Sequence, residues 1–97
     1  MSTTDNYIIN AVCDYYNISS DDLLSKSRVK TFAIPRHMAI FLLREINGAF
    51  YGDIAKLFNR HHATIIASHS SIAGLLDIKH KRTVREVAEL TKIIRSI

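Results

Sequence analysis

Apolar residues recur at helical spacing along almost the whole chain, and this pattern limits the fold more than any other feature. Glycine and proline, which interrupt helices, number only three and one in 97 residues. No segment alternates apolar and polar residues with the period of two that a half-buried strand requires. A sheet therefore has no obvious place. The pattern predicts an all-α fold of about six helices, packed as one domain over residues 1–97.

Capping residues and turn signals place the boundaries of these helices. The expected segments run from Asp5, taken as the N-cap, to Tyr16; through a short turn capped by Ser19 or Ser20; from Pro35 to Asn47-Gly48; from Tyr51 to Phe58; from His62 to Leu76; and from about Thr83 to Ser96. Pro35 suits the first position of a helix. The helix that follows carries the longest apolar run, so it is expected at the buried centre. Ile66 and Val84 are also expected in the core, and Tyr15 and Tyr16 at its edge, with one hydroxyl reaching water.

Positive charge is concentrated in one segment of the chain. Residues 26–37 hold four cations and no acid, and the nearest acids on either side are Asp22 and Glu45. The first 25 residues carry four acids and no cation, so the net charge of +4 is unevenly spread. Nucleic-acid phosphate is the commonest partner of such a surface. The segment predicts DNA binding, with a merely solvated face as the alternative.

The segments 51–58 and 62–76 have the lengths and the short connection of a helix-turn-helix. Asn59 between them tolerates the left-handed backbone of a tight turn. In this motif the second helix enters the major groove by its first residues. Those residues are Arg60, His61, His62, Ala63 and Thr64.

Several short motifs resemble the C-terminal, DNA-binding domain of the bacterial chromosomal replication initiator DnaA, over about residues 7–76. They are Tyr15-Tyr16, Asp22-Leu23-Leu24-Ser25-Lys26, the pair Arg28 and Lys30, Ala33-x-Pro35-Arg36, and Arg60-x-His62-x-Thr64-Ile65. The resemblance implies a helix-turn-helix fold of the Trp-repressor-like, DnaA C-terminal type. It also implies sequence-selective binding of double-stranded DNA in replication initiation or its regulation.

The resemblance further implies a role for each candidate residue. Arg28 would enter the minor groove. The residues that would hold the phosphate backbone are Lys26, Lys30 and Arg36, with His37 in the place of a family glutamine beside them. Residues 60–64 would lie in the major groove, where His62 and Thr64 would face bases.

The chain departs from the family pattern where sequence is read. The family's Asp is His61 and its first Thr is Ala63. A carboxylate accepts from a cytosine amine, whereas a histidine can donate to guanine. The family's Gly-Gly is the single Asn59, and basic residues late in the recognition helix are Ser70 and Ser71. A changed or relaxed target site and a weaker phosphate grip are expected.

No pattern in the sequence supports catalysis, a cofactor or a metal site. The chain has no His-Glu-x-x-His motif and no cysteine pair, and the adjacent His61 and His62 cannot share one helical face. No serine has a histidine and an acid at a recognisable spacing, and no Gly-rich phosphate loop is present. The chain is expected to be no enzyme and to use no small-molecule substrate.

The expected cellular compartment and oligomeric state rest on features that the sequence lacks. The lone Cys13 excludes an internal disulfide and favours a reducing compartment. No run approaches ~18 apolar residues, and the first residues resemble no signal peptide. A soluble, cytoplasmic, nucleoid-associated monomer without a membrane partner is expected. The short polar lead after Met1 favours a free-standing protein slightly over an excised domain.

Two alternatives stay open. The chain could be a protein-interaction module derived from an initiator domain, acting as a regulator or antagonist through replication proteins with little specific DNA binding. The stretch 79–82, with Arg85 one turn later, could be a second DNA contact or only the polar start of the last helix.

Overall fold

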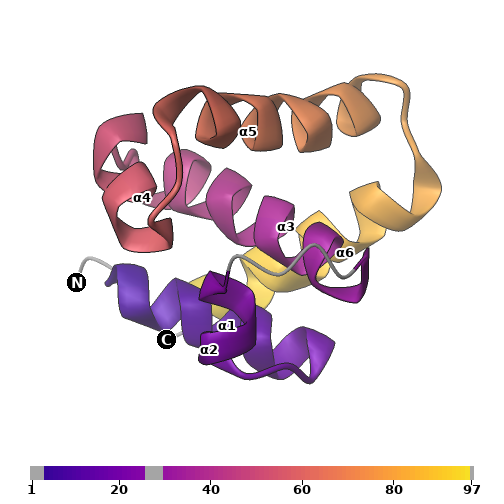
Figure 1. Ribbon diagram of the computed structural model, residues 1–97. Helices are drawn as coiled ribbons and strands as arrows, with labels where there is room; N and C mark the ends of the chain where they lie inside the picture. The colour runs from indigo at the N-terminus through magenta and orange to yellow at the C-terminus, as the bar shows by residue number, and fades with distance from the viewer. Residues whose placement is uncertain (1–3, 26–29, 97) are drawn as a thin grey trace.

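Six α-helices make up the computed structural model, which describes residues 4–25 and 30–96. They are α1 (Asp5–Tyr16), α2 (Ser20–Leu24), α3 (Lys30–Asn47), α4 (Tyr51–Phe58), α5 (His62–Asp77) and α6 (Lys81–Arg95). No strand occurs in these two stretches. The all-α fold and the number of helices predicted from the spacing are therefore confirmed (Figure 1).

The third helix, α3, is the centre around which the others pack. Each residue from Met38 to Leu43 is at most 6% exposed, so this part of α3 is enclosed on every side and not along one stripe. All five other helices contact it, α5 and α1 most extensively. Figure 1 shows α5 along one side of α3 and α1 along the other. The buried position expected of this helix is confirmed.

Cap residues account for the helix ends. Ser19 caps α2 as predicted. Gly48 has a φ of +63°, a left-handed conformation that glycine adopts without strain, and the next N–H, of Ala49, reaches back into the last turn of α3 at 3.3 Å. The expected cap of α1 is wrong by one residue. Thr4 is the N-cap, and Asp5 is already helical.

The expectation that Pro35 opens the third helix is wrong. The helix begins at Lys30, more than one turn earlier, and Pro35 lies inside it. The ring nitrogen of Pro35 has no hydrogen to donate to the carbonyl of Thr31, so the first turn of α3 lacks one helical hydrogen bond. A consequence is that residues 30–37 of the cationic segment are helical.

Two side chains expected in the core are exposed. Ile66 is 38% exposed and Val84 is 42% exposed. In α6 the prediction was wrong only at the start of the helix, because Val84 lies beside the buried face and not on it, whereas Leu90 and Ile94 are buried as expected. The buried residues of α6 are Thr83, Glu86, Leu90 and Ile94.

A polar network joins α1 to α6. Glu86 is only 5% exposed; it accepts the hydroxyl of Tyr16 and pairs with Arg82, whose Nε lies 2.7 Å from its Oε2. Tyr15 donates to Glu89 one turn away. Burial alone would raise the pKa of Glu86, but the hydrogen bonds from Tyr16 and Arg82 outweigh burial and lower it. Both tyrosines thus bind carboxylates, whereas the sequence predicted one hydroxyl in water.

We expect Glu86→Gln to lower the free energy of unfolding at neutral pH by about 1–3 kcal/mol, because hydrogen bonds to a charged acceptor are lost. The folded-state pKa of Glu86 is lowered from an ordinary value of 4.5. Its contribution is therefore complete above that value and is lost as the pH falls through the lower, folded-state pKa. Urea denaturation across this range should show the gap between native and variant closing in acid. A gap of constant size would contradict the network. Glu89→Gln, which loses the exposed carboxylate that accepts from Tyr15, should show a smaller gap and serves as the comparison.

Candidate nucleic-acid interface

Helices α4 and α5 form the predicted helix-turn-helix. Asn59 ends α4 with a φ of 50°, in the left-handed region. The N–H of the next residue, Arg60, donates to the carbonyl of Ala55 at 3.0 Å and closes the end of the helix. One asparagine therefore makes the corner for which the resemblance implies two glycines.

His61 caps the start of α5. Its Nδ1 accepts the backbone N–H of Ala63 at 3.1 Å, which requires an unprotonated Nδ1 and leaves the ring hydrogen of the neutral form on Nε2. The sequence predicted a base-reading residue at this position and missed the cap. An aspartate, which the resemblance implies here, would be a preferred cap. The departure at His61 therefore alters the helix start as well as the groove-facing chemistry.

The first turn of α5 faces solvent. The residues from His61 to Thr64 are all exposed, so the structure brings these candidates together on one accessible turn. The ring of His62 lies edge-on to that of Tyr51, with centroids 6.1 Å apart, and is supported on one side by α4. Beyond this turn, α5 carries no lysine or arginine, and Ile66 is among its exposed residues. The rest of the helix therefore adds no positive charge.

Arg36, expected on a DNA phosphate, is buried, with 6% of its surface exposed. Its guanidinium donates to the carbonyls of Leu23 at 3.0 Å, Ser25 at 3.0 Å and Asp22 at 3.4 Å. Burial lowers the pKa of Arg36, and the nearby charge of Arg60 lowers it further. This placement corrects the expectation: because α3 starts at Lys30, Arg36 falls on its inward side and holds the end of α2.

Arg60 binds the same carbonyl as Arg36. Its guanidinium donates to the carbonyl of Ser25 at 2.8 Å, and its Nε is buried without a hydrogen-bond partner among the described residues. Two guanidinium groups thus hold the residue that directly precedes positions 26–29. Sequence reasoning missed this role, because nothing in a sequence separates an arginine that binds a carbonyl from one that binds a phosphate.

His37 lies close to this pair of arginines and is half-buried. Its Nδ1 is enclosed and has no hydrogen-bond partner within the described stretches. Burial lowers the pKa of His37, and the charges of Arg36 and Arg60 lower it further. The ring is therefore neutral at neutral pH and brings no positive charge to a phosphate.

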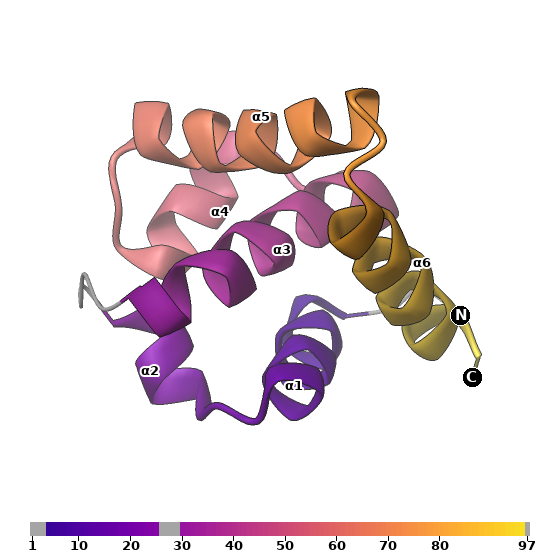
Figure 2. The same cartoon turned by 90° about the vertical axis from the view of Figure 1, so that its right-hand side faces the viewer.

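The other cationic candidates are not placed by the structure. Lys26 and Arg28 lie outside the described residues, and only the backbone of Lys30 is described. Ser25, which binds Arg60, and the start of α3 lie at the end of the molecule where α5 begins (Figure 2). The described residues on either side of positions 26–29 therefore lie at the same end as the first turn of α5.

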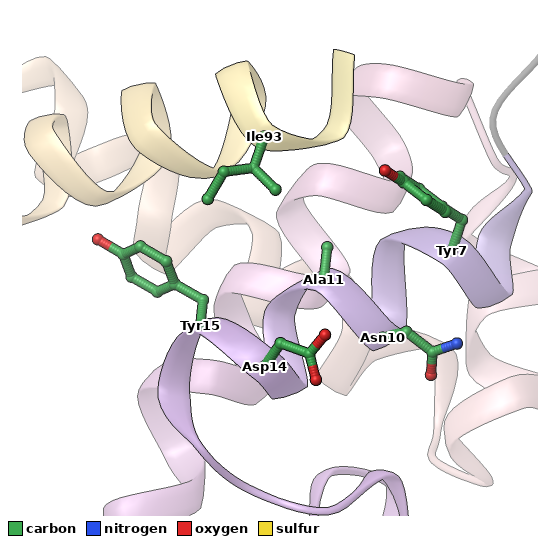
Figure 3. Close-up of a pocket in the computed structure, with 6 residues that line it drawn as sticks. All are labelled: Tyr7, Asn10, Ala11, Asp14, Tyr15 and Ile93. Atoms are coloured by element: carbon green, nitrogen blue, oxygen red, sulfur yellow. The ribbon is translucent and has the colours of Figure 1, made fainter. Parts of the chain in front are cut away.

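A groove of about 340 Å³ lies elsewhere, between α1 and α6 (Figure 3). Its lining residues are Tyr7, Asn10, Ala11, Asp14, Tyr15 and Ile93. Residues 4–25 and 30–96 contain no group of three or more His, Cys, Asp or Glu side chains that could hold a metal ion. No helix in those stretches is both long and apolar enough to cross a membrane.

Known proteins are similar to this chain over most of its length. Residues 6–72 match the family described as Bacterial dnaA protein helix-turn-helix. The chain is 33% identical over 95 residues to chromosomal replication initiator protein DnaA 1 of Chlamydia trachomatis serovar D, which covers 96% of this chain and 21% of the relative. It is 35% identical over 85 residues to the DnaA initiator of Caldanaerobacter subterraneus subsp. tengcongensis, covering 87% of this chain and 19% of the relative. The chain spans about a fifth of the length of these curated relatives.

We expect His61→Asp to raise the free energy of unfolding by about 0.5–1 kcal/mol, because a carboxylate caps the helix better and is attracted to its positive end. The measurement is urea denaturation at neutral pH. His62→Asp, with the same charge one residue further on and no cap to make, should gain less. Equal gains would assign the effect to charge alone.

His37→Gln should flatten the pH dependence of stability. The folded-state pKa of His37 is lowered from 6.5, so the unfolded chain takes up its proton first. The contribution of His37 is complete above that value and is lost as the pH falls from there toward the folded-state pKa. Melting temperatures measured from about pH 7.5 to about pH 5 should fall less in the variant than in the native chain. Parallel curves would contradict the assignment.

Proposed function

The chain belongs to the bacterial DnaA family of C-terminal helix-turn-helix domains, and from this we propose that it binds duplex DNA sequence-selectively, in replication initiation or its regulation. The observation that carries the proposal is the exposed first turn of α5, from His61 to Thr64, at the same end of the molecule as Ser25 and Lys30. A recognition helix and a cationic segment at one end suit adjacent grooves of one duplex.

Arg28 is proposed as the minor-groove residue. A minor groove attracts inserted arginine by its negative potential, and the position lies between Lys26 and Lys30, which would hold phosphates on either side. The two guanidinium groups on the carbonyl of Ser25 support this arrangement, because they hold the start of the segment beside α5. Arg36 and Arg60 act in this proposal by positioning the segment, and not by contacting DNA.

The first turn of α5 is proposed to read the major groove. Because Nδ1 of His61 is engaged in the cap, Nε2–H is the group left for a base, and it can only donate. A donor suits the O6 and N7 acceptors of guanine, whereas the family's carboxylate accepts from cytosine. The methyl group of Ala63 suits a thymine methyl, and His62 and Thr64 supply the remaining polar contacts. The preferred site is therefore expected to differ from the family's at the base that faces His61.

Few cations are left for the phosphates of this duplex. Arg36 and Arg60 are engaged with carbonyls, and α5 has no lysine or arginine. Three cations, Lys26, Arg28 and Lys30, remain in the segment. Since each phosphate contact contributes roughly 0.9 to the slope of log affinity against log salt, a shallow slope is expected for this surface. The partner is double-stranded DNA, bound by a monomer at the nucleoid.

The test is fluorescence anisotropy with a duplex that carries the family's initiator box and with a scrambled duplex, over a salt series. Arg28→Ala should weaken binding to the box by about tenfold or more and reduce the preference for it, as expected for loss of a base-reading arginine. Lys79→Asn removes the same charge at an exposed position whose φ of 57° asparagine tolerates, and it should keep the preference.

The double change His61→Asp plus Ala63→Thr tests the reading turn in the same assay. It restores the carboxylate acceptor and the hydroxyl, so the preference should move toward the family's box. A double variant with unchanged site preference would show that the roles carried over from the family are wrong for this turn.

One observation favours a second candidate, a protein-interaction module with little specific DNA binding. Phe50, directly before α4, is 73% exposed, and Ile66 on the uncharged part of α5 is 38% exposed. Replication proteins are the partners proposed for such a surface. Binding to DNA that is weak, equal for both duplexes and insensitive to Arg28→Ala would favour this module.

A further inference from the structure

The outer side of α6 carries a row of cations that the helix-turn-helix does not use. Lys81, Arg85, Lys92 and Arg95 are all exposed and follow one another at spacings of four, seven and three residues. Ala88 fills the gap in the middle. These spacings place the five residues on one side of the helix. At about 1.5 Å per residue the row extends over about 21 Å.

Acids neutralise this row only in part. The two acids of α6 are both used on another side of the helix, where Glu86 accepts from Tyr16 and Arg82, and Glu89 accepts from Tyr15. None of the four cations forms an ion pair with a carboxylate in the part of the chain that the structure describes. The charge of Arg85 contributes to lowering the pKa of Glu86, but none of the four cations is directly paired, so the row carries a net positive charge.

Stability of the helix accounts for only part of this row. Lys92 and Arg95 lie in the last turn of α6, where the helix dipole favours cations, whereas Lys81 and Arg85 do not. Lys81 is the first residue of α6, where a cation opposes the positive end of the helix dipole. Arg82 in the same turn is offset by Glu86, but the cations of the row have no such partner. The charge arrangement therefore points outward, to an anionic ligand.

The row lies away from the proposed helix-turn-helix interface. Helix α6 packs against α1, α3 and α5. Figure 2 shows α6 on one side of the molecule and α2, α4 and the start of α5 on the other. With principal extents of 33 × 29 × 25 Å, the body of the protein separates the two surfaces. A straight duplex that lies on one surface does not reach the other.

We propose that the α6 row binds the phosphate backbone of a second duplex DNA segment. A single strand carries one phosphate per about 3.4 Å of helix axis, so the row runs beside about six phosphates. The cores of protein interfaces are depleted in charged residues and enriched in aromatic ones, whereas this row has four cations around one alanine and no aromatic residue. Insertion into a membrane would need a continuous apolar side. Helix α6 buries Leu90 and Ile94 in the core, and its exposed apolar residues Val84 and Ile93, nine positions apart, lie on different sides of the helix.

The row gives the chain a second mode of DNA binding. Its contacts are to phosphates alone, so it binds any sequence, and four contacts correspond to a salt slope of about −3.6. A chain that holds one duplex at α5 and another at α6 bridges two DNA segments. This property goes beyond reading a site and does not depend on which site is read.

The test compares Arg85→Gln plus Lys92→Gln with Asn6→Asp plus Asn10→Asp. Both pairs lower the net charge by the same amount at exposed positions, one on the row and one on α1. In the first arm, each pair is combined with Arg28→Ala, and binding to a duplex of unrelated sequence is measured over a salt series. The row pair should lower the affinity about tenfold and reduce the salt slope by about two, as expected for two lost phosphate contacts. The α1 pair should change neither.

In the second arm, which rests on the proposed function, a bead-bound duplex that carries the family's initiator box captures a free labelled duplex of unrelated sequence. The native chain and the α1 pair should capture it, and the row pair should not. Equal capture by the row pair, or equal loss in the α1 pair, would overturn the proposal. So would row-dependent binding to anionic phosphatidylglycerol vesicles without row-dependent binding to DNA. The first arm could show binding that depends on the row while the comparison of box and scrambled duplexes shows no site preference. That result would contradict the helix-turn-helix proposal and support the row.

Discussion

The enclosure of α3 on every side is the constraint on which the rest of the structure depends. Because Met38 to Leu43 leave no face for water, other helices must cover α3 all round, and a short chain can do so only with closely spaced elements. The charged residues of α3 therefore lie toward its two ends, outside the enclosed stretch. Arg36 near the start cannot reach solvent and binds the carbonyls at the end of α2. The geometry of the candidate interface is thus a consequence of core packing.

Much of the fold could be predicted from the sequence, because apolar spacing and caps are local signals. Asn59 and Gly48 adopt the left-handed conformations that their turns require, and the helix boundaries they imply are correct. The errors arose where a local signal competed with packing. Pro35 is typical of a first helical turn, yet α3 begins at Lys30 and Pro35 lies inside it. Val84 fitted the apolar pattern of α6, yet Thr83 and Glu86 are the buried residues at the start of this helix. Glu86 is held there by Tyr16 and Arg82.

Less of the candidate site could be predicted, because the same residue types serve two purposes. The helix-turn-helix pattern predicted that the residues from His61 to Thr64 share one turn at the start of α5, and they lie there, all exposed. The sequence did not reveal that His61 caps the helix, since histidine is not among the residues preferred at that position. It also did not reveal that Arg36 and Arg60 meet at one carbonyl, since that contact joins segments remote in sequence. Cationic composition indicates where phosphate can bind. Burial and hydrogen-bond partners are needed to distinguish the cations that can bind phosphate from those already engaged within the protein.

The proline inside α3 has a consequence for how the end of the molecule can respond to contact. Unwinding Lys30 to Ile34 breaks fewer hydrogen bonds than unwinding the same length of an uninterrupted helix, because Pro35 has already removed one. The helical turn ahead of the proline is therefore a separate unit of local unfolding, with a lower opening free energy than the enclosed helix behind it. This turn can open while Arg36, just beyond the proline, stays bound to the carbonyls at the end of α2, so contact at this end of the molecule need not disturb the core.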